Sequence, residues 1–300
     1  MAKIKSTPVK TADLKTLDVV IPVYNEQKIL EKTINTLHAF LSEAMKEYNW
    51  KIIVADNASK DNTLVIAKAL SSRFPRVSFI HLDQKGRGRA LRRAWSESTA
   101  DIRTYMDVDL STALEAFSPL VNALATEYDL ATGTRLEKES HTKRSLFREV
   151  LSRGYNVLVK LILYTKYSDA QCGFKGITKQ AAEELIPQVK DNEWFFDTEL
   201  LTLSEKQGYK LFEIPVTWVE DPDSRVRIVK TVAQYLRDLL RLRFDLLCGA
   251  SRRKKPVQAG THSPDDECGE NEEKHKKSGK NQQPMAQERV PEIVEKVARK

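Results

Sequence analysis

The chain has 300 residues, of which 41% are hydrophobic and 30% are charged, and its formal net charge is +7. This composition predicts one large or two small globular domains and excludes a chain that is disordered throughout. The charge excess is too slight to favour a nucleic-acid partner, which requires a dense basic face. Cys172, Cys248 and Cys268 are scattered, which excludes a disulfide framework and a CxxC metal site and suits a reducing compartment.

Both ends of the chain differ from its middle. Residues 1–15 are polar and lack the apolar segment of a signal peptide, so we expect a flexible N-terminal segment. From residue 251 onward hydrophobic periodicity is lost, which predicts a hydrophilic, disordered tail over 251–300. No uncharged apolar run reaches the ~18 residues that span a bilayer. We therefore expect a single domain over 16–250 that is soluble or peripheral to a membrane.

Short β-branched runs alternate with amphipathic stretches in this domain. Runs at 17–24 and 51–55 predict parallel strands buried on both faces, and the apolar spacing between them predicts a helix capped by Asn25. The pattern continues with strands at 77–81, 102–106 and 130–133 and helices at 89–98, 114–126, 146–164, 195–207 and 228–247. We therefore predict an α/β fold with a doubly wound, mostly parallel central sheet.

Polar residues follow the predicted strands. In an open parallel sheet these positions face the ligand crevice. They are Tyr24, Asn25 and Glu26 after the first strand, Asp56, Asn57 and Ser59 after the second, and Asp107 and Asp109 after the fourth. The paired aspartates suit Mg²⁺ or Mn²⁺, which combine one or two carboxylates with water and substrate phosphates. The alternative is that Asp107 and Asp109 only cap the next helix.

Residues 83–95 (DQKGRGRALRRAW) place five cations around a helix N-terminus, where they oppose the helix dipole. A bound anion such as phosphate would remove the conflict. The cations are Lys85, Arg87, Arg89, Arg92 and Arg93, of which the last two equally suit a solvated basic face. The stretch lacks the third glycine of a dinucleotide fingerprint, which excludes an NAD site.

A series of motifs in order resembles the family 2 glycosyltransferases with a GT-A fold, a Rossmann-like nucleotide-diphospho-sugar transferase fold. The motifs are VVIPVYNE (19–26), DNASKDNT (56–63), KGRGRA (85–90), MDVDLS (106–111), GTR (133–135), SDAQCGFKG (168–176), WFFDTELL (194–201) and EIPVTWVEDPDSRV (213–226). The resemblance covers residues 18–244 and is closest to the polyprenyl-phosphate hexose synthases, above all the dolichyl-phosphate β-glucosyltransferases.

The resemblance implies roles for individual residues. The nucleotide sugar would contact Pro22, Tyr24, Glu26, Asp56, Ser59, Lys85, Arg89 and Asp107. Asp107 and Asp109 would hold Mg²⁺ or Mn²⁺, and Asp197 and Glu199 would face the sugar or the leaving diphosphate; the alternative for this last pair is a role as first-turn helix charges. Ser111 stands where the mannose synthases have a glutamine ligand, which weakens a mannose assignment and leaves the metal's full ligand set open.

The resemblance also implies a polyprenyl or dolichyl phosphate acceptor and transfer with inversion. A phosphate monoester is largely dianionic at neutral pH, so no strong general base is needed. Candidate residues for the acceptor phosphate are Arg135, Arg148, Ser152 and Arg225. Arg148 and Ser152 are four residues apart, on one face of a predicted helix, and match the R-x-x-x-S spacing of the mannose synthases.

A lipid acceptor requires contact with a membrane. The basic and apolar stretches 143–166 and 228–247 suit helices at a membrane surface, although packing on the sheet is the alternative. We expect peripheral attachment at a cytoplasmic membrane face, directly or through a separate membrane protein.

Three alternatives to glucose transfer from UDP-glucose to a lipid phosphate stay open at this point. They are transfer to a soluble glycan or another hydroxyl acceptor, transfer of mannose from GDP-mannose, and a non-catalytic nucleotide-sugar sensor.

Overall fold

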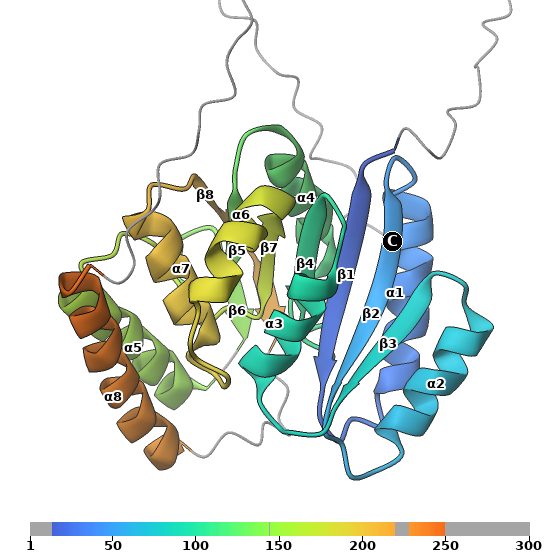
Figure 1. Ribbon diagram of the computed structural model, residues 1–300, viewed down its shortest axis with the longest axis horizontal. Coiled ribbons are helices and arrows are strands. Elements are labelled where there is room, and N and C mark those ends of the chain that lie inside the picture. Colours follow the sequence, from blue (N-terminus) through green and yellow to red (C-terminus); the bar gives the residue numbers. More distant parts are fainter. Residues whose placement is uncertain (1–13, 144, 220–227, 250–300) are drawn as a thin grey trace, which may run out of the picture. The chain divides into compact units, whose positions relative to one another are not determined.

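A seven-stranded sheet organises the chain in a computed structural model that describes residues 14–143, 145–219 and 228–249. The strand order is β3-β2-β1-β4-β7-β5-β8 (Figure 1). The strands are β1 (Thr16–Val23), β2 (Asn49–Asn57), β3 (Val77–Leu82), β4 (Ile102–Met106), β5 (Leu130–Thr134), β7 (Phe174–Thr178) and β8 (Leu211–Pro215). All neighbouring pairs are parallel except those of β7, which runs antiparallel to β4 and β5. The predicted mostly parallel sheet is confirmed.

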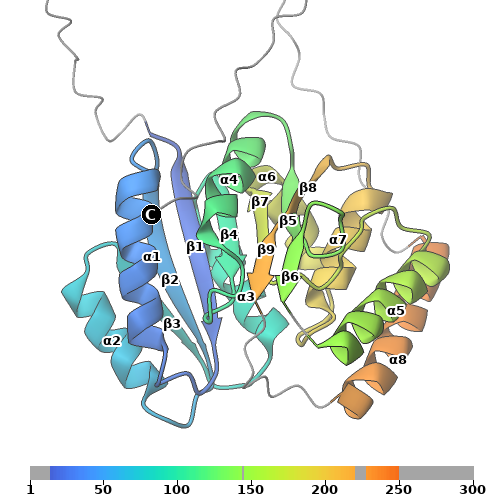
Figure 2. The same cartoon turned by 180° about the vertical axis from the view of Figure 1, so that it is seen from behind.

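Helices cover both faces of this sheet. One face packs against α1 (Leu30–Ala44), α2 (Thr63–Arg73) and α4 (Phe117–Thr126), which Figure 2 shows from their side. The other packs against α3 (Arg87–Glu97), α5 (Leu146–Leu163), α6 (Lys179–Leu185), α7 (Phe196–Lys206) and α8 (Ile228–Leu247). The core forms two apolar clusters, one on each face, because the central strands bury side chains on both sides.

A small second sheet pairs β6 (His141–Lys143) with β9 (Thr217–Val219). An isolated bridge between Thr112 and Trp218 joins it to the loop after β4. The loop that begins with Asp107 is therefore tied to a segment more than 100 residues away in the sequence.

Most predicted elements are present within one or two residues of their expected ends, and α8 matches its predicted range. The prediction that Asn25 caps the first helix is wrong. Helix α1 begins at Leu30 with Ile29 at the N-cap, and Asn25 has a left-handed φ of 57° and holds a loop instead. Six elements were not predicted from the sequence: the antiparallel β7, and α2, α6, β6, β8 and β9. The expectations for the tail beyond 250 and for residues 1–13 lie outside the described residues.

Candidate active site

The loops after β1 and β2 are tied together at the carboxyl edge of the sheet. The Asn25 N–H donates to Ser59 Oγ at 2.9 Å, and Asn25 Oδ1 accepts from the Lys60 N–H at 2.7 Å. The Glu26 N–H donates to Thr63 Oγ1 at 2.8 Å. Glu26 and Ser59, both predicted to contact the nucleotide, therefore lie on two loops that support each other.

Asp56 is fully buried near the end of β2. Its Oδ2 lies 2.6 Å from His81 Nδ1 on β3, and its Oδ1 accepts from the Ser59 N–H at 3.3 Å. Each carboxylate oxygen can accept more than one hydrogen bond, so a contact with a nucleobase is compatible with these partners. The sequence reasoning did not include His81, although the regular βα spacing placed it at the end of the third predicted strand.

Tyr24 and Lys85, two further predicted nucleotide residues, lie together. The Lys85 ammonium is 3.7 Å from the centre of the Tyr24 ring, within the range of a cation–π contact. Pro22 lies two residues earlier in β1, and Arg89 donates to the Lys85 carbonyl at 2.5 Å. An aromatic ring, an exposed lysine and a half-buried arginine therefore lie at the same edge of the sheet.

Arg87 occupies the centre of the basic stretch and has protein carboxylates as its anionic partners. Its Nη2 donates to Asp107 Oδ1 at 2.5 Å and its Nη1 to Asp197 Oδ2 at 2.8 Å. Burial alone would lower the pKa of Arg87, but the carboxylate charges of Asp107 and Asp197 raise it well above its ordinary value. Arg87 therefore stays charged, and protein carboxylates supply the anion that the sequence led us to expect beside it.

The other cations of this stretch have different surroundings. Arg93 is exposed and pairs with Glu97, as expected for a solvated face. Arg92 is partly buried and donates to the Asp191 carbonyl at 2.7 Å. Among the five cations, Lys85 contacts Tyr24 in the loop after β1, and Arg89 donates to the Lys85 carbonyl.

Asp197 is buried in a polar cluster behind Asp107. Its Oδ1 accepts from the Tyr105 hydroxyl and lies 3.7 Å from Lys175 Nζ. Burial, followed by the charge of Asp197, raises the pKa of Tyr105 well above its ordinary value, so this hydroxyl remains a donor. The predicted residues Asp107 and Asp197 are thus brought together through Arg87, with Asp197 inside and Asp107 toward solvent.

The sequence reasoning did not include Tyr105 and Lys175. Both lie inside strands, where nothing in the sequence marks their side chains as part of a site. Trp194, whose ring centre is 5.2 Å from the Arg87 guanidinium, lies at the same site and is partly exposed.

The position of the Asp107 carboxylate also depends on the absence of a side chain at Gly173. A Cβ on Gly173 would lie 1.8 Å from Asp107 Oδ2, and the Asp107 N–H donates to the Gly173 carbonyl at 3.2 Å. Any larger residue at position 173 would force this carboxylate to move. The loop between α5 and β7 therefore fixes where the first aspartate of the DxD motif can lie.

Glu199 lies elsewhere. Its carboxylate makes two hydrogen bonds to Arg241 on α8, at 2.9 and 3.0 Å, and accepts from the Asp191 N–H at 2.9 Å. These contacts anchor α8 on α7 and include no residue of the Asp107 cluster. They do not support the expected role of Glu199 at the sugar.

Two of the four residues predicted to bind the acceptor phosphate lie on one helix, and the other two do not. Arg135 forms a bidentate pair with the buried Asp169, at 2.7 and 3.0 Å, and this pairing outweighs burial and lowers the pKa of Asp169 to about 2. Arg148 and Ser152 lie together on α5, as expected. Arg225 lies outside the described residues.

The carboxylates present fit a divalent cation. Asp107 exposes 40% of its side chain at the end of β4, and Asp109 lies two residues on in an exposed turn. Nowhere in residues 14–143, 145–219 and 228–249 do three or more His, Cys, Asp or Glu side chains form a group that could hold a metal. Two carboxylates completed by substrate phosphates are a usual arrangement for Mg²⁺.

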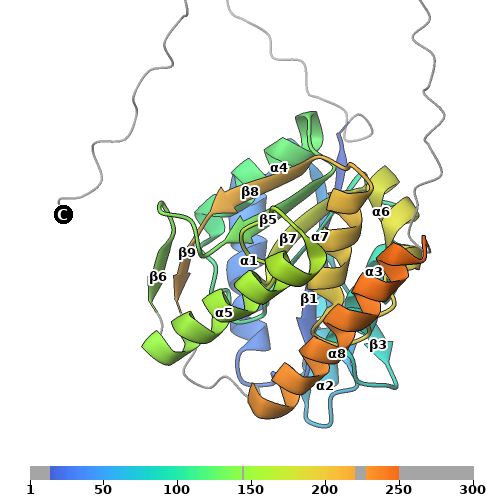
Figure 3. The ribbon, with the colours of Figure 1, turned by 90° about the vertical axis from the view of Figure 1, so that its left-hand side faces the viewer.

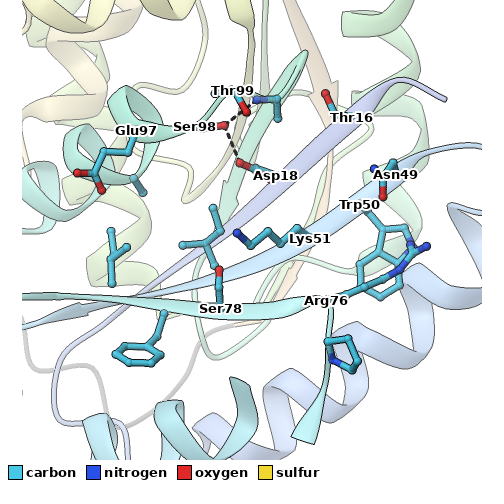
Figure 4. Close-up of a pocket in the computed structure, with 16 residues that line it drawn as sticks. Thr16, Asp18, Asn49, Trp50, Lys51, Arg76, Ser78, Glu97, Ser98 and Thr99 are labelled. Carbon is cyan, nitrogen blue, oxygen red and sulfur yellow. Dashed lines mark hydrogen bonds between the residues drawn. The ribbon is translucent and has the colours of Figure 1, made fainter. Parts of the chain in front are cut away.

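A hollow of about 510 Å³ lies at the opposite edge of the sheet from the predicted site. Figure 4 shows Asp18, Lys51, Arg76 and Ser98 around it, and Ser98 Oγ donates to Asp18 Oδ2 at 2.6 Å. It lies near the amino ends of β1, β2 and β3 and contains none of the predicted site residues. The predicted site and this hollow are therefore separate.

Comparisons with known proteins identify relatives of this chain. The chain is 35% identical to glycosyltransferase AglD of Haloferax volcanii over 232 residues, which are 77% of this chain but 37% of AglD. It is 32% identical to the dolichyl-phosphate β-glucosyltransferase of Homo sapiens over 79% of this chain and 78% of that protein.

The solved structures show the same fold. Glucosyl-3-phosphoglycerate synthase from Mycobacterium tuberculosis, in complex with UDP, superposes with a TM-score of 0.57 at 19% identity, over 78% of this chain and 80% of that one. A structure of the same enzyme with Mn²⁺, UDP and glucosyl-3-phosphoglycerate gives 0.57 at 18% identity, over 82% and 87%. This likeness identifies a GT-A fold. The sequence model described as glycosyl transferase family 2 matches residues 18–186, and the chain belongs to that family of glycosyltransferases.

Proposed function

We propose that the protein transfers glucose from UDP-glucose to a polyprenyl phosphate of the dolichyl phosphate type, with inversion at the anomeric carbon. The observation that carries this proposal is the arrangement of Asp107, Arg87 and Asp197 beside the Tyr24–Lys85 pair at one edge of the sheet. The names of the relatives, several of which are dolichyl-phosphate β-glucosyltransferases, supply the substrate class.

The donor side of the site divides into two parts. Tyr24 and Asp56 would contact the base and Ser59 the nucleoside, while Lys85 and Arg89 would supply cations for the diphosphate; contacts among these residues support the grouping. Asp107 and Asp109 would hold Mg²⁺ or Mn²⁺, which when bound stabilises the charge of the departing nucleoside diphosphate. The role of the chain's own residues is to orient Asp107, through Arg87 on one side and Gly173 on the other.

On the proposed acceptor side, the candidate residue Ser152 lies on α5. Its hydroxyl is buried and has no hydrogen-bond partner within the described structure, which is uncommon for a buried polar atom. One turn further on, Asn156 Oδ1 accepts from the Ala170 N–H at 2.8 Å. This bond ties α5 to the loop that carries Gly173, so the helix of Arg148 and Ser152 and the carboxylate of Asp107 share one support.

The reaction itself needs positioning more than proton transfer. The phosphate oxygen of the lipid is already a nucleophile at neutral pH, because its second pKa is about 6. Cations such as Arg148 would hold this dianion close to the donor. Attack on the anomeric carbon expels the nucleoside diphosphate in one displacement.

Helices α5 and α8 form the surface that we propose to meet the membrane. They lie side by side (Figure 3), with Tyr155 and Tyr235 rings 4.8 Å apart, and both carry exposed apolar side chains. Most large exposed apolar residues of the described chain are on these two helices, namely Leu146, Phe147, Val150, Val157, Leu161, Leu236, Leu240, Phe244 and Leu247. Arg153 and Lys160 on α5 and Arg237 and Arg243 on α8 add basic charge, which attracts anionic lipid.

None of the helices in the described ranges is both long and apolar enough to cross a bilayer. We propose peripheral attachment through the α5–α8 surface, at a cytoplasmic membrane face, directly or with a membrane protein as partner.

Incubation with radiolabelled UDP-glucose, UDP-GlcNAc or GDP-mannose, together with polyprenyl phosphate and Mg²⁺, tests the proposal. Solvent extraction then separates lipid-linked from water-soluble label. We expect lipid-linked label from UDP-glucose and its loss in Asp107→Asn, whereas Asp83→Asn, at a fully exposed carboxylate, should retain activity. Label that stays in the aqueous phase with every donor would refute the proposal.

A further inference from the structure

Arg87 is held between two carboxylates whose surroundings differ. Its Nη2 lies 2.5 Å from Asp107 Oδ1 and its Nη1 2.8 Å from Asp197 Oδ2, and only 11% of its side chain is exposed. The rings of Tyr105 and Trp194 lie 5.0 and 5.2 Å from the guanidinium carbon. The guanidinium therefore has a defined position with one carboxylate at each end.

The Asp197 end is the anchored one. Asp197 exposes 3% of its side chain, its second oxygen accepts from Tyr105, and Lys175 Nζ lies 3.7 Å away. Asp107 exposes 40% of its side chain, so water and ligands can reach it. Breaking the bond to Asp197 would leave a buried charge without its guanidinium, whereas the bond to Asp107 can be replaced at much smaller cost.

The bond between Arg87 and Asp107 competes with the proposed cation site. Arg87 contacts Oδ1 of Asp107 and leaves Oδ2 without its guanidinium, but a guanidinium this close to the carboxylate repels a divalent cation bound to either oxygen. The donor's diphosphate, in contrast, is an anion whose oxygens match the donors of a guanidinium. Donor binding thus removes one partner of Arg87 and supplies another.

We propose that Arg87 is a positioning residue that exchanges partners when the donor binds. Without ligand, its Nη2 holds Asp107; with the donor in place, it keeps Asp197, releases Asp107 to the cation and donates to the diphosphate. This inference rests on the proposed function, because it takes Asp107 as a cation ligand. Its consequence is that cation and nucleotide bind cooperatively, because either one favours the exchanged state of Arg87.

Separate titrations of Mn²⁺ and UDP on Arg87→Met, by calorimetry, test the exchange. Mn²⁺ alone should bind about threefold or more tightly than to wild type, because its competitor is gone. UDP with saturating Mn²⁺ should bind about tenfold more weakly, because a charged donor is lost. An arginine that only supports the fold would not give these opposite changes. Arg93→Met, on the same helix but paired with the exposed Glu97, should leave both affinities unchanged.

Arg87→Met leaves Asp197 without its main cation, so the double variant Arg87→Met/Asp197→Asn provides a second measurement. It removes both charges and should show the same gain in Mn²⁺ affinity. Unchanged or weaker Mn²⁺ binding in both variants, or unchanged UDP binding, would overturn the exchange alone. A wild-type chain that binds neither Mn²⁺ nor UDP would overturn the proposed function and the exchange with it.

Discussion

Gly173 leaves the space that the Asp107 carboxylate fills, since a Cβ at position 173 would lie 1.8 Å from Asp107 Oδ2. Asp107 directly follows β4 and Gly173 directly precedes β7, 66 positions apart in the sequence. Their backbones are also joined by a hydrogen bond of 3.2 Å. The SDAQCGFKG motif therefore acts on the DxD motif through a steric requirement.

Gly173→Ala should displace Asp107 and reduce kcat by about 100-fold, since misplacement of about 1 Å can cost this much. The free energy of unfolding should change less, because Asp107 is partly exposed and can move toward solvent. Steady-state kinetics and thermal unfolding measure the two effects.

Gly154→Ala is the matched control for this substitution. Gly154 lies inside α5, and a Cβ there would meet nothing within 4 Å. The change should leave kcat unaltered and stabilise the protein by about 0.5–1 kcal/mol through the helix backbone. Wild-type kcat in Gly173→Ala would contradict the steric account.

The pairing of Asp169 with Arg135 should make stability depend on pH in the acid range. The folded-state pKa of Asp169 is lowered to about 2, so its contribution is complete above its unfolded value of about 3.9 and is lost as pH falls toward 2. A shift of this size corresponds to about 2 kcal/mol. Asp169→Asn should therefore be less stable than wild type at pH 7, with the difference shrinking between pH 4.5 and 3.

Urea unfolding of both proteins across this pH range measures the difference. Glu127→Gln, which alters an exposed pair with Lys210, should show no such convergence. A gap between wild type and Asp169→Asn that stays constant from pH 7 to 3 would contradict the assignment.

Glu199→Gln should affect stability more than chemistry. Glu199 is 1% exposed and pairs with Arg241 across α7 and α8, and the loss of one partner of such a buried pair costs about 3 kcal/mol. We expect a lower midpoint of urea unfolding and a kcat within about threefold of wild type when the folded fraction is matched. If kcat falls instead by more than 100-fold in a fully folded variant, Glu199 contacts substrate as the family resemblance implied.

Charge placed on the α5–α8 surface should weaken membrane binding. Phe147→Glu and Leu240→Glu introduce negative charge at side chains that are 65% and 63% exposed, so folding should be preserved. Cosedimentation with vesicles that contain anionic lipid should fall by about tenfold, because apolar contact and charge attraction are both reduced.

The control for this surface is Val65→Glu, at a position on α2 that is 64% exposed and lies on the other face of the sheet. It should bind vesicles as wild type does. Equal loss of binding in all three variants would show that net charge, and not this surface, governs attachment.

The parts of the fold that follow a local period were predictable, and the long-range contacts were not. Apolar spacing predicts β1, β2, β4, α1 and α3, because each element buries a defined face. The antiparallel β7 was missed because its direction is set by its neighbours β4 and β5 and not by its own residues. The residues after the strands were predictable because all carboxyl ends of parallel strands meet at one edge.

Within the site, the conflict of Arg87 with the helix dipole led us to expect a bound anion such as phosphate, whereas the anionic partners in the structure are protein carboxylates. Its carboxylate partners, Asp107 and Asp197, lie 20 and 110 positions away in the sequence. Pairing over such distances depends on the tertiary fold, as does the burial of Tyr105 and Lys175 around Asp197. Asn25 was misassigned as a cap because its side chain serves the Lys60 N–H on a neighbouring loop instead.

The central claim is that donor and cation bind at the carboxyl edge of the sheet, at Asp107. A crystal structure of the chain with Mn²⁺ and UDP, with the anomalous signal of manganese recorded, tests it most directly. The account predicts a manganese peak bonded to Asp107, with the diphosphate beside Arg87 and the base beside Tyr24. A peak elsewhere, such as the hollow around Asp18 at the opposite edge, with no manganese at Asp107, would contradict it.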